Sequence, residues 1–205
     1  MTLETEPLTA YVLAGGKSSR MGTDKAFLEL AGRPLIAHAV ELAGSVTGNV
    51  RIVGDPEKFA AFGMIVPDVY KDRGPLGGIH AALLNSNTDA SLVLGVDLPF
   101  INRAFLGFLI STARSCNALV TVPSCGSHFQ TLCAVYRRPL GEIADRALAS
   151  GHNKIDALFS DVPVRVIDEE EIKSAGFSPS IFRNLNTPEE WEAARRDFEL
   201  RWTHL

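Results

Sequence analysis

The sequence predicts an α/β domain with a mainly parallel sheet and helices on both of its faces. Short apolar segments of strand length alternate with helical segments along most of the chain, which is the pattern of parallel strands joined by helical crossovers. The segment Ser91–Val96 is almost continuously apolar, as expected of a strand that is covered on both faces. Hydrophobic residues make up 46% of the 205 residues, which is enough for one substantial core.

Strands and helices can be assigned in order through the first half of the chain. Apolar runs that end at glycine, aspartate or proline predict its strands, because these residues interrupt strands and begin turns. The predicted strands are Leu8–Leu13, Val50–Val53, Met64–Val66 and Ser91–Val96. The predicted helices are one that begins at Pro34, a short one through Phe59 and Phe62, and one that begins at Ile79 after the turn motif Gly74-Pro75-Leu76-Gly77-Gly78.

The second half continues the alternation and ends in a helix. Pro163 places the last predicted strand at a sheet edge, or lies at the start of that strand. Thr187, Pro188 and Glu190 form a capping-box sequence, which predicts the start of the last helix. The other predicted elements are a helix over Arg103–Arg114, a strand over Ala118–Val122, an antiparallel strand over Phe129–Tyr136, a helix over Pro139–Ala149 and a strand over Val162–Ile167.

Composition bounds the domain count and the partners. No linker or repeat interrupts residues 1–205, so we expect a single domain. The formal net charge of −4 gives no sign of a broad basic face for nucleic acid. No apolar stretch reaches the roughly 18 residues of a membrane span, and the N-terminus lacks the features of a secretory signal. Cys116, Cys125 and Cys133 include no closely spaced pair, which favours free thiols and a cytoplasmic protein.

A glycine-rich loop follows the first predicted strand. Gly15, Gly16 and Gly22 allow backbone amides to approach an anion closely, while Arg20 and Lys25 add side-chain charge. This composition predicts a phosphate-binding loop, although an ordinary strand-to-helix turn with solvated lysines fits it about equally well. The spacing of the glycines excludes the Walker A motif and the dinucleotide-binding motif.

Two aspartates follow predicted strands, at the sheet edge where open α/β sheets bind ligands. Asp97 comes directly after the most apolar strand, and a carboxylate there must be solvated, paired or metal-bound. Mg²⁺ takes oxygen ligands and often only one or two protein carboxylates, so Asp97 is either a candidate Mg²⁺ ligand or a helix-capping aspartate. Asp68 either accepts hydrogen bonds from N1–H and the N2 amine of guanine or is a solvated loop residue.

Several segments together resemble the bacterial molybdenum cofactor guanylyltransferases. They are Leu13-Ala14-Gly15-Gly16, Arg20-Met21-Gly22, Lys25, Gly74-Pro75-Leu76-Gly77-Gly78, Asp97-Leu98-Pro99 and the stretch from Asn184 through Asn186 to Glu190. The resemblance implies a Rossmann-like three-layer nucleotidyltransferase domain, with residues 1–100 mainly binding the NTP and residues 101–205 mainly binding the acceptor. It further implies transfer of GMP from Mg·GTP to the terminal phosphate of molybdenum–molybdopterin, with release of pyrophosphate.

The resemblance also implies a role for individual residues. The implied catalytic residues are Lys25, Asp97 and Arg20, with Asp97 as the ligand of Mg²⁺. The implied nucleotide-binding residues are Leu13, Ala14, Gly15, Gly16, Gly22, Lys25, Asp68 and Asp97. The implied acceptor-binding residues are Gly74, Gly78, Lys154, Asn184 and Asn186.

Two positions depart from the family pattern. The segment from Gly151 to Lys154 stands where relatives carry an arginine, and a lysine lacks the planar fork of a guanidinium. This weakens the case for acceptor recognition by Lys154 and leaves the NTP-binding half unaffected. Gly54 stands where some relatives have asparagine, so one side-chain contact to the nucleotide is expected to be missing.

Two alternative functions are also compatible with the sequence. The first is a related nucleotidyltransferase with another base or acceptor, such as a cytidylyltransferase for the same cofactor, although Leu-Ala-Gly-Gly favours GTP. The second is a non-catalytic nucleotide-binding protein that delivers the cofactor, against which the presence of both Lys25 and Asp97 argues. The expected partners are GTP, molybdenum–molybdopterin and cofactor-delivery or molybdoenzyme chaperone proteins, and we expect a monomer.

Overall fold

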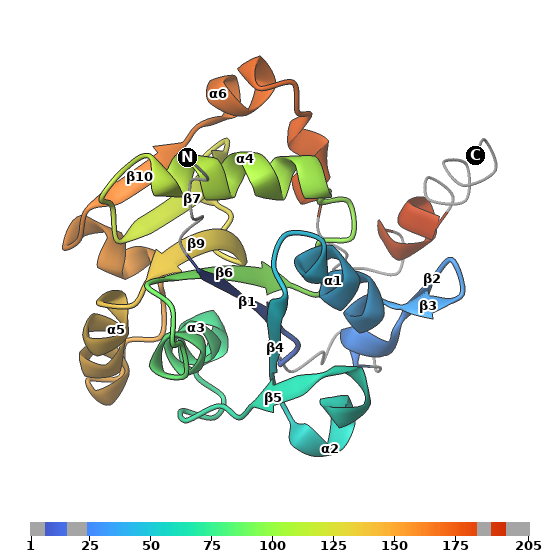
Figure 1. The fold of residues 1–205 in the computed structure, drawn as a ribbon, viewed down its shortest axis with the longest axis horizontal. Helices are drawn as coiled ribbons and strands as arrows, with labels where there is room; N and C mark the ends of the chain where they lie inside the picture. Colours follow the sequence, from blue (N-terminus) through green and yellow to red (C-terminus); the bar gives the residue numbers. More distant parts are fainter. Residues whose placement is uncertain (1–6, 16–23, 184–189, 196–205) are drawn as a thin grey trace, which may run out of the picture.

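An eight-stranded sheet forms the middle layer of the protein (Figure 1). The computed structural model describes residues 7–15, 24–183 and 190–195. Seven strands follow the order β10-β7-β9-β6-β1-β4-β5, and the short β8 pairs with the carboxyl end of β7. The strands of this sheet are β1 (Leu8–Leu13), β4 (Asn49–Val53), β5 (Met64–Val66), β6 (Ala90–Gly95), β7 (Val120–Cys125), β8 (His128–Phe129), β9 (Cys133–Arg137) and β10 (Val164–Ile167).

Parallel pairing dominates the sheet, as predicted. β1 pairs in parallel with β4 and β6, β4 pairs with β5, and β7 pairs with β10 at the predicted sheet edge. β9 runs antiparallel to both of its neighbours, β6 and β7. The direction predicted for Phe129–Tyr136 is therefore confirmed, but this segment divides into β8 and β9. β9 lies inside the sheet, where its residues from Cys133 to Tyr136 are buried.

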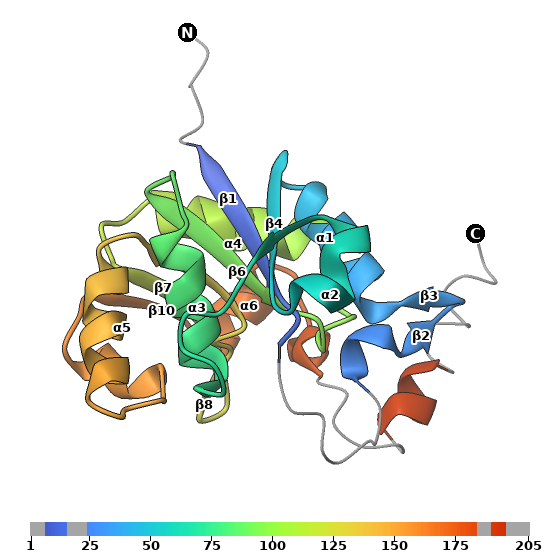
Figure 2. The same ribbon diagram turned by 90° about the horizontal axis from the view of Figure 1, so that it is seen from below.

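Helices cover both faces of the sheet (Figures 1 and 2). Helices α1, α4 and α6 pack on one face, and α3 and α5 pack on the other. The side chains of β1 divide between these layers: Ala10 and Val12 join the first core, whereas Tyr11 and Leu13 join the second, as alternate residues of a strand must. This arrangement confirms the predicted three-layer α/β fold.

The helices and turns follow in chain order. Among the described residues, no helix combines the length and apolar composition that a bilayer crossing requires. The α-helices are α1 (Leu35–Gly44), α2 (Pro56–Phe59), α3 (Gly74–Leu84), α4 (Arg103–Arg114), α5 (Leu140–Ala149) and α6 (Glu169–Ser174). The 3-10 turns are η1 (Lys25–Phe27), η2 (Ala60–Phe62), η3 (Asp156–Ser160) and η4 (Pro179–Phe182).

Three helix starts differ from the predictions. α5 begins at Leu140 rather than at Pro139, which is its N-cap. α3 begins at Gly74 rather than at Ile79, because the fixed φ of Pro75 suits the first turn of a helix, where its missing amide proton is not needed. α1 begins at Leu35, and Pro34 is its N-cap. Pro34 also ends a hairpin that the sequence analysis did not predict, formed by β2 (Glu29–Leu30) and β3 (Arg33–Pro34).

Only part of the last helix can be compared with its prediction. Residues 190–195 are helical, and Ala194 and Trp191 pack against a small apolar cluster with Phe100. Thr187 and Pro188 of the predicted capping box lie outside the described residues.

Arg137, at the end of β9, joins several elements at the amino edge of the sheet. Its guanidinium forms an ion pair with Asp89. It also donates hydrogen bonds to the carbonyl oxygens of Ala113 (3.1 Å), Cys116 (3.0 Å) and Ala118 (3.2 Å). The side chain is only 17% exposed, so these contacts are largely shielded from water. Arg137 thereby satisfies the carbonyl group of Ala113 in the last turn of α4, where carbonyl groups lack a backbone partner within the helix, and two carbonyl groups in the segment that follows.

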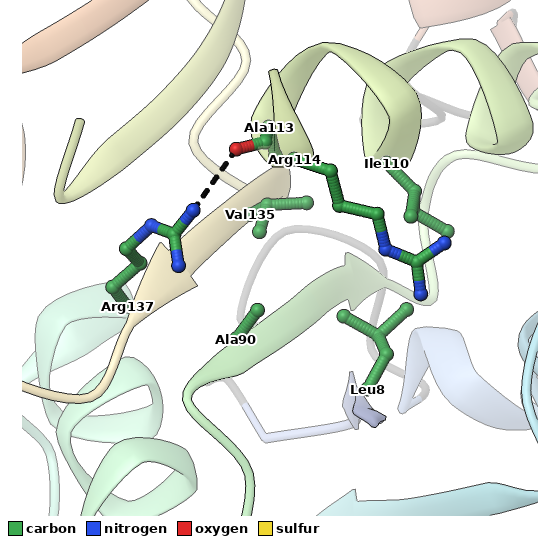
Figure 3. A pocket seen from close by; sticks show the side chains of 7 residues that line it. All are labelled: Leu8, Ala90, Ile110, Ala113, Arg114, Val135 and Arg137. Atoms are coloured by element: carbon green, nitrogen blue, oxygen red, sulfur yellow. Dashed lines mark hydrogen bonds between the residues drawn. The ribbon is translucent and has the colours of Figure 1, made fainter. Parts of the chain in front are cut away.

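A small cavity lies next to Arg137 (Figure 3). Its volume of about 10 Å³ is close to the minimum that a single water molecule needs. It is therefore a packing defect at the amino edge and not a substrate site. The lining residues are Leu8, Ala90, Ile110, Ala113, Arg114, Val135 and Arg137.

Replacement of Arg137 is expected to destabilise the fold. Arg137→Met keeps most of the aliphatic packing but leaves Asp89 and three carbonyl groups without their donor. We expect the free energy of unfolding to fall by roughly 2–4 kcal/mol, because each hydrogen bond to a charged group contributes appreciably. Urea denaturation measures this change. Arg138→Met, at the neighbouring exposed position, is the matched control, and an equal effect of both variants would contradict the role given to Arg137.

Candidate active site

The chain crosses from one side of β1 to the other as it builds the sheet. After β1 it adds β4 and β5 on one side and then returns to place β6 on the other. Leu13, the last residue of β1, therefore pairs with Val53 on one side and with Gly95 on the other. In open α/β sheets, the crevice outside the carboxyl ends of the strands at such a switch point is where ligands bind.

Asp68, two residues beyond β5, approaches the loop that follows β1. A Cβ atom on Gly15 would lie 3.5 Å from Oδ2 of Asp68. The other carboxylate oxygen, Oδ1, is buried, and the described part of the chain offers it no hydrogen-bond donor. Burial also raises the pKa of Asp68. Buried polar atoms usually have a partner, so this geometry suits a ligand that brings N–H groups to Asp68.

Asp97, two residues beyond β6, lies partly buried at the same edge. Its Oδ1 would lie 2.8 Å from a Cβ atom on Gly95, so the carboxylate folds back over the end of β6. Burial raises the pKa of Asp97, and the positive charge of Lys25 acts in the opposite direction. A desolvated carboxylate with a cation in its field is typical of functional sites.

The residues at this edge fit Mg²⁺. The described residues contain no cluster of three His, Cys, Asp or Glu side chains that could hold a metal. Mg²⁺ does not require one, because it is usually held by one or two carboxylates and completes its shell with water and substrate phosphates. Asp97 offers such a carboxylate, and its burial leaves the charge poorly solvated. A hard cation can relieve that deficit.

Lys25 begins η1, the turn that follows the glycine-rich loop. Asp24 caps this turn, because its Oδ1 accepts a hydrogen bond from the amide of Ala26 (3.3 Å). The structure thus brings Lys25 to the edge that also holds Gly15 and the two aspartates. Three predicted loop residues lie outside the described part of the chain: Gly16, Arg20 and Gly22.

The start of α3 packs directly against β1. A Cβ atom on Gly78 would lie 2.9 Å from Cδ2 of Leu13, closer than real Cβ contacts allow. Close packing therefore explains the glycine at position 78 without any ligand. The absence of a side chain lets α3 pack against the strand that leads into the glycine-rich loop. The acceptor-binding roles of Gly74 and Gly78 stay predictions.

The segment that departs from the family pattern lies beside the start of α3. Arg73, the residue before α3, donates a long hydrogen bond from Nη1 to Oδ1 of Asn153 (3.4 Å). Lys154 is exposed in the same segment. Arg73 is not among the residues predicted from the sequence, although its place directly before the motif that begins at Gly74 is a signal that could have found it. Asn184 and Asn186 lie outside the described residues.

The departure at Gly54 has a structural explanation. A Cβ atom at this position would lie 3.0 and 3.1 Å from two carbons of the Phe59 ring. Phe59 itself is buried. The ring of Phe59 thus occupies the space beside Gly54 that a larger residue would need.

Comparison with known proteins identifies the family. The sequence matches the family described as "MobA-like NTP transferase domain" over residues 10–164. The molybdenum cofactor guanylyltransferase of Vibrio campbellii is 34% identical over 188 residues, covering 87% of this chain and 90% of that protein. The molybdenum cofactor guanylyltransferase of Syntrophotalea carbinolica is 31% identical over 192 residues, covering 92% and 90%.

A solved structure extends the similarity to the fold. Molybdopterin-guanine dinucleotide biosynthesis protein A from Archaeoglobus fulgidus has a TM-score of 0.82 with this structure and 25% sequence identity. The similarity covers 93% of this chain and 98% of that one. The resemblance that the motifs indicated is thereby confirmed, and the chain belongs to the MobA-like NTP transferase family of nucleotidyltransferases.

Proposed function

We propose that the protein transfers GMP from Mg·GTP to the terminal phosphate of molybdenum–molybdopterin. The convergence of Gly15, Asp68, Asp97 and Lys25 at one sheet edge carries the proposal, and the names of the sequence relatives support it. An oxygen of the acceptor phosphate attacks the α-phosphorus of GTP and forms a P–O–P bond. The bond from the α-phosphorus to the bridging oxygen breaks, and pyrophosphate leaves with that oxygen.

The nucleophile in this reaction needs no activating base. A phosphate monoester is already anionic, so the chain must mainly position two polyanions and offset their charge. Lys25 contacts the phosphates, the backbone of Gly15, Gly16 and Gly22 cradles them, and Arg20 assists the leaving pyrophosphate. Asp97 would hold Mg²⁺, which needs few protein carboxylates. Bound Mg²⁺ supplies Lewis-acid stabilisation of the charge at the α-phosphate.

Asp68 reads the base in this proposal. Guanine presents N1–H and the N2 amine side by side, and a carboxylate can accept from both. Cytosine and uracil do not present this pair of donors. The buried Oδ1 of Asp68, which lacks a donor among the described residues, supports this assignment. A site built around such an acceptor discriminates strongly against ligands that leave it unpaired.

The second half of the chain, residues 101–205, mainly binds the acceptor in this proposal, with contributions from Gly74, Gly78, Lys154, Asn184 and Asn186. Arg73 adds a guanidinium beside Asn153, and its planar fork can bind a phosphate in a way that Lys154 cannot. All of these groups come from one chain, so a monomer suffices. The free thiols of the protein suit a reducing compartment such as the cytoplasm.

Removal of the charge of Asp97 or of Lys25 is expected to lower turnover strongly. Asp97→Asn and Lys25→Met each lower kcat for guanylylation by about 10²-fold or more, as loss of one preorganised charge-stabilising group does. A pyrophosphate-release assay with GTP and molybdenum–molybdopterin measures the rate. Asp161→Asn, at an exposed position, is the control for Asp97. Near-native turnover by either variant would contradict the role of that residue.

The Asp97 variant is expected to fold at least as stably as the wild type. Burial raises the pKa of Asp97 above its value in the unfolded chain, so the unfolded state releases this proton first as the pH rises. The free energy of unfolding therefore falls between the two pKa values, and at neutral pH the ionised carboxylate lowers stability. Thermal denaturation of Asp97→Asn at pH 7 should give an unchanged or higher Tm. For the same reason, the acid limb of the wild-type kcat/KM profile, which reports the pKa values of the free enzyme, should lie above the pH expected for an ordinary carboxylate.

Asp68 variants are expected to lose base discrimination. Wild-type protein should bind GTP more tightly than ITP, which lacks only the N2 amine, and much more tightly than CTP. In Asp68→Ala the ratios of the affinity for GTP to the affinities for ITP and CTP should fall by about tenfold or more, because the carboxylate that accepts from both guanine donors is gone. Titration calorimetry with Mg²⁺ and each nucleotide provides the affinities. If the variant keeps the wild-type affinity ratios among GTP, ITP and CTP, Asp68 does not recognise the base.

Replacement of Arg73 is expected to weaken binding of the acceptor and to leave binding of GTP unchanged. Arg73→Lys keeps the charge but loses the fork, so we expect KM for molybdenum–molybdopterin to rise about tenfold, in line with the loss of one charge-assisted hydrogen bond. KM for GTP should stay within about twofold of the wild type, because uniform binding of GTP is untouched. Arg146→Lys, on exposed helix surface, serves as the matched control. An increase in KM for GTP alone would place Arg73 on the nucleotide side.

A further inference from the structure

The turn that carries Lys25 is tied to a distant helix through Asp24. The two carboxylate oxygens of Asp24 have separate partners. Oδ1 accepts from the amide of Ala26 and caps η1, whereas Oδ2 accepts from Nζ of Lys58 at 2.9 Å. Lys58 belongs to α2, which lies beside β5 (Figure 1). The ion pair therefore connects the end of the glycine-rich loop to an element 34 positions further along the chain.

Aromatic packing joins the same two parts of the chain. The ring of Phe27 stacks on Phe59, with centroids 5.4 Å apart and an interplanar angle of 9°. The rings of Phe27 and Phe62 form a second, tilted contact, with centroids 6.2 Å apart. Phe59 is 1% exposed, and its ring fills the space beside Gly54. Phe27 thus packs on a buried support whose position the rest of the fold determines.

These two sets of contacts restrict the orientation of η1. The aromatic rings fix the end of the turn at Phe27, and the carboxylate of Asp24 fixes its beginning. Lys25 lies between these two points, so both sets of contacts determine where its backbone lies. A three-residue turn has few hydrogen bonds of its own, so its direction depends on such external contacts.

We propose that Lys58 is a positioning residue of the nucleotidyl transfer, which acts through Asp24 to hold Lys25 toward Asp97 and the triphosphate. The inference rests on the proposed function. The Lys58 side chain is 51% exposed, and exposed ion pairs contribute little to stability. In contrast, displacement of a charged group by about 1 Å can lower a rate by about 10²-fold. The effect of the ion pair should therefore appear in the rate and not in the Tm.

Three single variants test this role. Lys58→Met removes the charge but keeps the length of the side chain, and Lys58→Arg restores the charge. Lys173→Met is the matched control, because Lys173 forms a similar exposed ion pair with Glu169 (2.7 Å) on the distant helix α6. For Lys58→Met we expect kcat to fall by about 10- to 100-fold. The Tm should change by less than about 4 °C, as for loss of a surface pair in a chain of this size. Lys58→Arg should recover most of the rate, and Lys173→Met should match the wild type.

A double variant tests whether Lys58 acts through Asp24. Asp24→Asn loses the charge of the carboxylate but keeps an oxygen that can accept from the Ala26 amide. If the two residues act as a unit, Asp24→Asn combined with Lys58→Met is no slower than the slower single variant, because coupled effects are not additive. Multiplication of the two single effects would overturn the proposed path.

Hydrogen exchange gives a readout that does not require turnover. In Lys58→Met the backbone amides of residues 26–28 should exchange faster than in the wild type, whereas Lys173→Met leaves them unchanged. Faster exchange without a loss of kcat would make the ion pair purely structural and overturn the proposal. Unchanged exchange with a higher KM for GTP would make Lys58 a direct ligand of GTP and also overturn it. If the wild type transfers no GMP but exchange responds as expected, the proposed function fails while the attachment of η1 through Lys58 stands.

Discussion

The parallel pairing of β1 with β4 on one side and with β6 on the other is the constraint on which the site depends. β1 is buried on both faces and paired along both edges, so its carboxyl end has little freedom to move. The register at Leu13 then fixes where the chain leaves β1 and where it leaves β6. Gly15 and Asp97 are two residues beyond those points. The edge at which both residues lie is therefore set by strand register and not by the conformation of a long loop.

The carboxyl edge of the parallel strands also carries two carboxylates, those of Asp68 and Asp97, whose charge the surrounding protein solvates poorly. Burial raises the pKa of both Asp68 and Asp97, which means that each ionised carboxylate costs the folded state some free energy. Groups that bind these carboxylates can recover this free energy on binding. A nucleotide and a cation that bind only the folded protein also raise its apparent stability in proportion to their concentration over their Kd. Local instability and ligand affinity thus have a common origin at this site.

Local sequence patterns were sufficient to predict the elements that lead into the site. The apolar runs that end at Leu13 and Val66 gave the bounds of β1 and β5, because strand ends were marked by glycine or proline within two residues. Asp68 and Asp97 could be selected for the same reason, since the carboxyl ends of parallel strands meet at one edge. The position of a residue relative to a strand end is local information, and the sequence contains it directly.

Contacts between distant segments could not be predicted in this way. The pairing of Asp24 with Lys58 joins residues far apart in the chain, and each residue alone has the appearance of an ordinary surface charge. Arg73 becomes a candidate acceptor-binding residue only because the fold brings Asn153 beside it. The place of β9 inside the sheet likewise depends on pairing with β6, from which α4, β7 and β8 separate it along the chain. Capping and hydrophobic periodicity do not report such partners.

The location of β9 also has a consequence for how the chain folds. Strands β7, β8 and β9 follow one another closely in the sequence and pair locally, whereas β1, β4, β5 and β6 form a separate parallel group. Within the described sheet, these groups meet along the seam between β6 and β9. The β7–β9 unit has the lower contact order, so it can form early and then close the seam as a single late step. Until that step, the buried edge of β6 is an unpaired strand edge, which is the form in which partly folded chains aggregate.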